Sequence, residues 1–81
     1  MKIKEKEIKT IEELKATKFV TLDMVNKEEC KVEVIVYHEG KWLIWNCKTY
    51  KYERTDYETI INLAEEFLNK PTESTLIAGY F

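Results

Sequence analysis

The chain has 81 residues, of which 44% are hydrophobic and 35% charged, with two glycines, one proline and a formal net charge of −2. This length holds a single domain, residues 1–81, and the apolar content excludes an intrinsically disordered chain. The near-balance of charge argues against a protein that works by neutralising phosphates, and the absence of long apolar runs excludes a membrane span and a signal peptide, so we expect a cytoplasmic location.

The first predicted helix follows a short charged segment. Residues 1–9 alternate Lys and Glu around Ile3 and Ile8, which predicts either a frayed strand or an exposed helix. Thr10 is followed three residues later by Glu13, a spacing typical of a capping box at a helix N-terminus. We therefore expect a short helix over residues 11–17.

Three strands are predicted in the centre of the chain. Residues 19–25 alternate between apolar and polar side chains, and the runs 31–38 and 41–52 are rich in β-branched and aromatic residues. A two-residue loop at Glu39-Gly40 joins these two runs and pairs Tyr37 with Trp42, whereas a three-residue loop would shift one strand by a residue and exchange its faces. In the two-residue register, one face of the hairpin carries Val32, Val34, Val36, Leu43, Trp45 and Cys47, and the other carries Ile35, Tyr37, Trp42 and Ile44.

The second predicted helix spans residues 56–69. Thr55 and Glu58 form another capping-box spacing, apolar residues recur every three or four positions, and Pro71 prevents the helix from continuing. The tail, residues 71–81, ends in an apolar run from Leu76 to Phe81. Such a run either adds a fourth strand to the protein's own sheet or pairs with a partner.

These elements predict an α+β fold, in which a three-stranded antiparallel sheet in the order α-β-β-β-α carries the C-terminal helix on one face. We expect this helix to cover the face that bears Val34 and Trp45, with Trp45 in the core. The opposite face then needs another cover, supplied by the N-terminal segment or the tail, or else it stays open as a partner or dimer surface. The candidate partner-binding residues are the apolar anchors Tyr37, Trp42 and Ile44 and the acidic contacts Glu65 and Glu66.

A nucleic-acid-binding module is the alternative function. Stacking rings beside cations suit single-stranded nucleic acid, and the third predicted strand carries Lys48, Tyr50, Lys51 and Arg54. The α-β-β-β-α order is also that of double-stranded RNA-binding domains. The lysines expected at the start of the second helix are here replaced by Thr55, Asp56, Tyr57 and Glu58, so nucleic acid is not the favoured partner.

No pattern of catalytic residues is found in the sequence. His38 is the single histidine and adjoins a tight turn, and Cys30 and Cys47 have neither metal-ligand nor redox spacing. No glycine-rich phosphate loop accompanies them. We therefore expect no enzymatic activity, no cofactor and no metal.

The order of the predicted elements resembles that of small inhibitor proteins encoded by phages and mobile elements, including anti-CRISPR proteins of Gram-positive prophages. The resemblance rests on the helix 11–17, the strands 19–25, 31–38 and 41–52, and the helix 56–69. It implies a phage or mobile-element inhibitor or accessory protein that binds a host protein, such as a nucleic-acid-processing enzyme. A structural homodimer is a further alternative.

Overall fold

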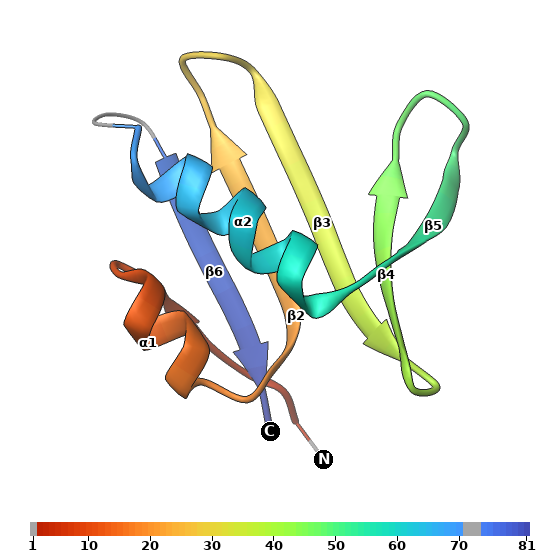
Figure 1. The fold of residues 1–81 in the computed structure, drawn as a ribbon, viewed down its shortest axis with the longest axis horizontal. Coiled ribbons are helices and arrows are strands. Elements are labelled where there is room, and N and C mark those ends of the chain that lie inside the picture. The colour runs from red at the N-terminus through yellow and green to blue at the C-terminus, as the bar shows by residue number, and fades with distance from the viewer. Residues whose placement is uncertain (1, 71–73) are drawn as a thin grey trace.

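The computed structural model describes residues 2–70 and 74–81 and contains one six-stranded sheet with two helices (Figure 1). The elements in chain order are β1 (Lys4–Glu7), α1 (Ile11–Ala16), β2 (Phe19–Asn26), β3 (Lys31–His38), β4 (Lys41–Asn46), β5 (Lys51–Thr55), α2 (Tyr57–Leu68) and β6 (Ser74–Tyr80). The strands lie in the order β1-β6-β2-β3-β4-β5, and every neighbouring pair is antiparallel. The α+β class is confirmed, whereas the predicted three-stranded sheet and the α-β-β-β-α order understate the fold.

Helix α1 begins at the predicted capping box. The Thr10 hydroxyl accepts a hydrogen bond of 3.1 Å from the Glu13 backbone N–H, and the Glu13 carboxylate accepts one of 2.9 Å from the Lys9 N–H. Two N–H groups that would otherwise lack partners are thereby satisfied. At the other end the Thr17 hydroxyl donates to the Glu13 carbonyl oxygen, and the chain turns into β2.

Helix α2 begins one residue later than the predicted capping box implies. Thr55 is the last residue of β5, where it pairs with Trp42, so it is not the N-cap. Asp56 takes that place, and its carboxylate accepts a 2.8 Å hydrogen bond from the Thr59 N–H. This bond stabilises the charged form and lowers the pKa of Asp56.

The β3–β4 hairpin has the two-residue register predicted from the sequence. Tyr37 pairs with Trp42, and Val36 pairs with Leu43. The loop residues Glu39 and Gly40 both have positive φ angles, 51° and 76°, which matches the twist of a two-residue hairpin.

The predicted third strand, residues 41–52, is in fact two strands joined by a four-residue turn. The Asn46 side-chain oxygen accepts hydrogen bonds from the N–H groups of Lys48 and Thr49 (2.9 and 3.3 Å), and Tyr50 closes the turn with a φ angle of 56°. The turn contains no glycine or proline, so the usual breaker signals are absent. Residues 51–55 then run back along β4 as the edge strand β5.

The β2–β3 loop repeats this arrangement of Asn, four loop residues and Lys. Here Asn26 accepts a 2.8 Å hydrogen bond from the Glu29 N–H, and Cys30 has a φ angle of 54°. The Asn26 side chain is buried and donates to the Ser74 hydroxyl at 2.8 Å. Asn26 thus ties the loop to the start of β6.

Both chain ends become strands of the protein's own sheet. β6 lies between β1 and β2, so the tail from Ser74 to Tyr80 adds a strand within the molecule. The part of the predicted tail at residues 71–73 lies outside the described residues. Residues 4–7 of the N-terminal segment form a strand, which decides between the two predicted alternatives.

Both helices cover the same face of the sheet, and it is the face opposite to the one predicted (Figure 1). Ile35 is buried under the helices, and Trp42 and Ile44 pack against the core. Trp45 lies on the opposite face and is 36% exposed, so the prediction that it is a core residue is wrong. The strand residues that make up the core on the helix side are Leu22, Met24, Ile35, Leu76 and Ala78, together with Phe19.

The pairing of β2 explains this choice of face. Leu22 lies opposite both Ile35 and Ala78, and Met24 lies opposite Leu76, so three strands contribute large apolar side chains to one face. The other face of β2 carries Thr21 and Asp23. Neither helix of the described residues is long and apolar enough to cross a membrane.

Candidate functional site

An aromatic pocket opens where both helices meet one end of the sheet. Four rings from four elements converge there, and the hollow has a volume of about 320 Å³. The Trp42 ring lies 4.8 Å from Tyr37, 5.2 Å from Phe19 and 6.1 Å from Tyr57, measured between ring centroids. The pocket is lined by Phe19, Tyr37, Trp42 and Tyr57 together with Lys15, Thr17, Lys18 and Val20.

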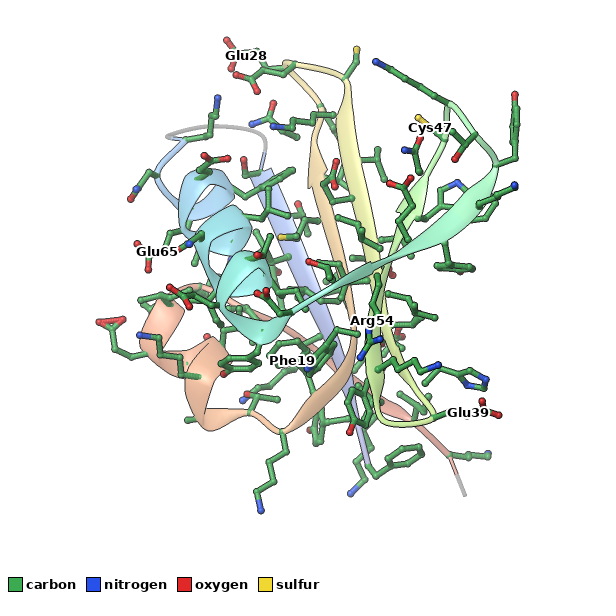
Figure 2. All side chains as sticks on the ribbon, turned by 45° about the vertical axis from the view of Figure 1, so that its right-hand side comes forward. Phe19, Glu28, Glu39, Cys47, Arg54 and Glu65 are labelled. Atoms are coloured by element: carbon green, nitrogen blue, oxygen red, sulfur yellow. The ribbon has the colours of Figure 1, made fainter. Side chains whose placement is uncertain are left out.

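The rings of the aromatic pocket differ in exposure. Phe19 is buried between the helices and the sheet (Figure 2). Trp42 is half-buried, whereas Tyr37 and Tyr57 are 45% and 41% exposed. Phe19 and Trp42 therefore form the floor, and the two tyrosines form walls that a ligand can reach.

The charged side chains that line the aromatic pocket are both lysines, Lys15 from the end of α1 and Lys18 from the segment before β2. An apolar floor with a cationic rim suits a group that carries a ring or an aliphatic side chain beside a negative charge.

The structure brings two of the predicted apolar anchors together and separates the third from them. Tyr37 and Trp42 meet in the aromatic pocket. Ile44 is two residues beyond Trp42 on the same face of β4 and packs against the core. Trp42 and Ile44 thus have structural contacts of their own, and a partner contact by either of them stays a prediction.

The predicted acidic contacts lie on the outer side of α2, toward its C-terminal half. Glu65 and Glu66 are exposed, and Glu65 points away from the sheet (Figure 2). They follow Tyr57 by eight and nine residues, which is about 12 Å along the helix. A partner that contacts both the aromatic pocket and these carboxylates must therefore span at least two turns of α2.

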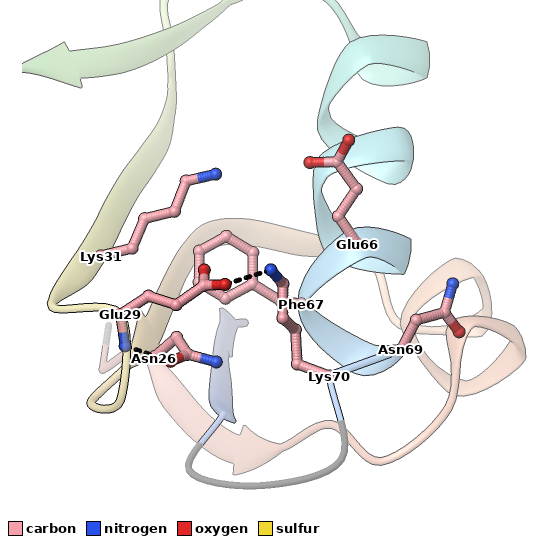
Figure 3. A pocket seen from close by; sticks show the side chains of 7 residues that line it. All are labelled: Asn26, Glu29, Lys31, Glu66, Phe67, Asn69 and Lys70. Atoms are coloured by element: carbon pink, nitrogen blue, oxygen red, sulfur yellow. Dashed lines mark hydrogen bonds and ion pairs between the residues drawn. The ribbon is translucent and has the colours of Figure 1, made fainter.

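Glu66 also lines a second hollow, of about 390 Å³, between α2 and the β2–β3 loop (Figure 3). The Lys70 ammonium forms an ion pair with the Glu29 carboxylate there, which lowers the pKa of Glu29. The Lys31 ammonium lies 5.6 Å from the centre of the Phe67 ring. Lys70 and Glu29 neutralise one another in this hollow, and their contact fastens the end of α2 to the loop.

The face of the sheet opposite the helices is uncovered, and we call it the open face. Its centre, the central patch, consists of Val32, Val34, Val36, Leu43, Trp45 and Tyr52. Val32 is 58% exposed, Tyr52 48% and Trp45 36%, and the Trp45 and Tyr52 rings touch edge to face at 5.0 Å. Beyond the Ile35–Ile44 pair, β3 and β4 diverge around a hollow of about 630 Å³ (Figure 1).

The residues of the nucleic-acid alternative are not gathered on one surface. Lys48 and Tyr50 lie in the β4–β5 turn, and Tyr50 is 78% exposed. Lys51 pairs with Asn46 on the helix side of the sheet, whereas Arg54 pairs with Leu43 on the open face. The four side chains therefore do not form one continuous stacking platform.

Of the eight residues that line the aromatic pocket, the sequence indicated two as site residues, Tyr37 and Trp42. It assigned Tyr57 to the apolar stripe of α2 and did not single out Phe19, Lys15 or Lys18. Lys15, Lys18 and Phe19 are near one another in the chain, but Tyr57 is 38 positions beyond Phe19 and meets it because α2 folds back over β2. No local pattern could have indicated them.

Among residues 2–70 and 74–81 no group of three or more His, Cys, Asp or Glu side chains could hold a metal ion. Within the same part of the chain His38 is exposed and lies 3.6 Å from the Glu39 carboxylate, and both cysteines are free and exposed. No protein-family model, curated protein or solved structure matches this chain.

Proposed function

We propose that this protein is a non-enzymatic binding domain whose aromatic pocket receives a side chain of a partner protein. The observation that carries this proposal is the convergence of Tyr37, Trp42 and Tyr57 in a hollow whose charged lining is two lysines. Tryptophan and tyrosine are the residues that most often dominate binding energy at protein interfaces. The hollow also gives them the partly enclosed setting in which such residues act.

The electrostatics of the site suggest how the partner is oriented. Lys15 and Lys18 favour an acidic group next to the inserted side chain, whereas Glu65 and Glu66 on α2 favour a basic strip about 12 Å away. A nucleic-acid-processing enzyme of a host would offer such a basic strip. The setting we propose is an inhibitor or accessory protein of a phage or mobile element, of the anti-CRISPR or anti-defence type.

The test is capture of partners followed by direct binding. The full chain is immobilised and exposed to host lysate with and without nuclease, and each protein retained after nuclease treatment is purified. Its affinity is then measured for the wild type, Tyr37→Ala and Tyr57→Ala. Both tyrosines are over 40% exposed, so these variants should stay folded, whereas Trp42→Ala would remove a ring from the core.

The expected result is a loss of thirtyfold or more in affinity for either variant, the size typical of an aromatic hot spot of about 2 kcal/mol. The matched control is Tyr50→Asn, because Tyr50 is more exposed than either tyrosine and lies outside the pocket. Equal binding by all variants would remove the aromatic pocket from the proposal. Loss of every captured protein on nuclease treatment would instead favour the nucleic-acid alternative.

A further inference from the structure

The central patch is a partly exposed apolar surface on the open face of the sheet. Its six side chains lie on adjacent strands, and three of them are between 36% and 58% exposed. Both helices are on the other face, so nothing in the described residues covers the patch. The patch surrounds the hollow between β3 and β4, and an exposed apolar surface around a hollow is typical of an interaction site.

The two edge strands of the sheet carry many charged side chains, whereas the centre of its open face is apolar. The outer strand β1 has the sequence Lys-Glu-Lys-Glu, and the outer strand β5 carries Lys51, Glu53 and Arg54 among its five residues. Charged side chains on short edge strands discourage the addition of another strand. Association of this protein therefore uses the face of the sheet.

Two opposite charges flank the central patch on the open face. Asp23 lies on β2 at one side, and Arg54 lies on β5 at the other. Within residues 2–70 and 74–81 neither of them forms an ion pair. Arg54 is in register with Thr21, which is two residues, or about 7 Å, along β2 from Asp23. A two-fold axis between β3 and β4 that is inclined to the strands places β2 of one copy over β5 of the other and brings each Asp23 toward the Arg54 of the second copy.

The size of the patch agrees with a modest interface. Four strands spaced by about 4.8 Å where they pair, and six residues of about 3.3 Å each, cover at least about 19 by 20 Å, and this area includes the hollow between β3 and β4. Two facing copies would bury on the order of 1,000 Å² of accessible surface, which is near the lower limit for a specific interface. The dimer should accordingly form in the micromolar range.

We propose that the central patch pairs face to face with the same patch of a second copy of this chain, with Asp23 and Arg54 forming reciprocal ion pairs at its two sides. The sheets then pack about 10 Å apart, as the sheets of β-sandwiches do. The helices lie on the two outer sides of the dimer. Because the aromatic pocket is on the helix side, it stays accessible in both copies, and the dimer is bivalent for the proposed partner.

The test is sedimentation equilibrium of the full chain from low micromolar to submillimolar concentration. The wild type should shift from monomer to dimer over this range. Arg54→Asp and Asp23→Arg should each raise the dissociation constant tenfold or more, because each places like charges opposite one another. The double variant, Asp23→Arg with Arg54→Asp, should recover most of the affinity.

Lys51→Glu is the matched control, since it reverses a charge on the same strand but on the helix side. Its dissociation constant should equal that of the wild type, and circular dichroism confirms that each variant is folded. A wild-type chain that stays monomeric throughout would overturn the proposal. A double variant whose dissociation constant is as high as those of the single variants would also overturn it. So would a chain that stays monomeric by itself and associates through the patch only with a different protein.

Discussion

Gly79 of β6 lies closely under the Thr21 side chain of β2, and replacing it tests the packing of the sheet directly. It pairs with Thr21 on β2 and with Glu5 on β1. A Cβ atom added at Gly79 would lie 2.1 Å from the Thr21 hydroxyl oxygen and 3.0 Å from a methyl carbon of Ile3. The first distance is more than 1 Å shorter than an ordinary van der Waals contact, so the Thr21 side chain or β6 must move.

Two effects of Gly79→Ala oppose each other, and their sizes decide the sign. Alanine in a strand gains about 0.5–1 kcal/mol over glycine because the unfolded chain loses less entropy on folding. Overpacking in a closed site costs about 1–3 kcal/mol, and the restricted rotamers of threonine limit relief at Thr21. We expect Gly79→Ala to lower the free energy of unfolding by about 1–2 kcal/mol, measured by urea denaturation.

A second background isolates the contact responsible. In Thr21→Ala the hydroxyl is gone and the remaining Cβ would lie at an ordinary distance of 3.5 Å, so the 3.0 Å contact with the exposed Ile3 side chain is the only close contact of the three that remains and Gly79→Ala should cost clearly less there than in the wild type. Thr75→Ala is the control background, because Thr75 lies on the same face of β6 but does not contact Gly79. Equal losses in all three backgrounds, or no loss in the wild type, would refute the reasoning.

Three further predictions concern the caps, turns and charges. Thr10→Ala should destabilise the protein by about 1 kcal/mol in thermal melts, because the Glu13 N–H loses its acceptor; an unchanged melting temperature would contradict the cap. Tyr50→Gly should stabilise by up to about 1 kcal/mol, since the exposed Tyr50 has a φ angle of 56°; a loss of stability would mean that its side chain contributes more than its backbone strain. Burial raises the pKa of Glu33 above its usual 4.5, so its folded form binds a proton more readily and wild-type stability falls as pH rises through that raised pKa. Glu33→Gln should therefore be more stable than the wild type at pH 7, with the difference vanishing in acid, and a difference independent of pH would exclude this cause.

The sequence was sufficient to predict those features that depend on interactions between residues close together in the chain. The Thr10–Glu13 capping box, the Glu39–Gly40 hairpin and the apolar stripe of α2 depend on neighbours in the chain, and the structure contains all three. The turn before β5 was missed for a local reason as well. Turns are usually recognised in a sequence by glycine or proline. Here the chain reverses instead through the hydrogen bonds of the Asn46 side chain and the positive φ angle of Tyr50.

The two faces of the central hairpin were predicted with the right members except Cys47, which lies in the β4–β5 turn and not in the strand, but the choice between the faces was wrong. An isolated β3–β4 hairpin is apolar on both sides, so its own sequence favours neither face for the helices. The choice is decided by β2 and β6, whose pairing adds Leu22, Met24 and Leu76 to the side of Ile35. That pairing depends on contacts between residues about fifty positions apart.

The sequence by itself therefore determined the α+β class, the cap of α1, the hairpin register and the presence of exposed aromatic side chains. Only the tertiary structure decided where the aromatic side chains lie: Trp42 and Tyr37 beside α2 in the aromatic pocket, and Trp45 on the open face. The physical reason is that hydrogen bonds and caps act over one turn or one strand pair, whereas burial is shared by all elements at once. Which apolar side is covered is settled only when the whole sheet and both helices pack together.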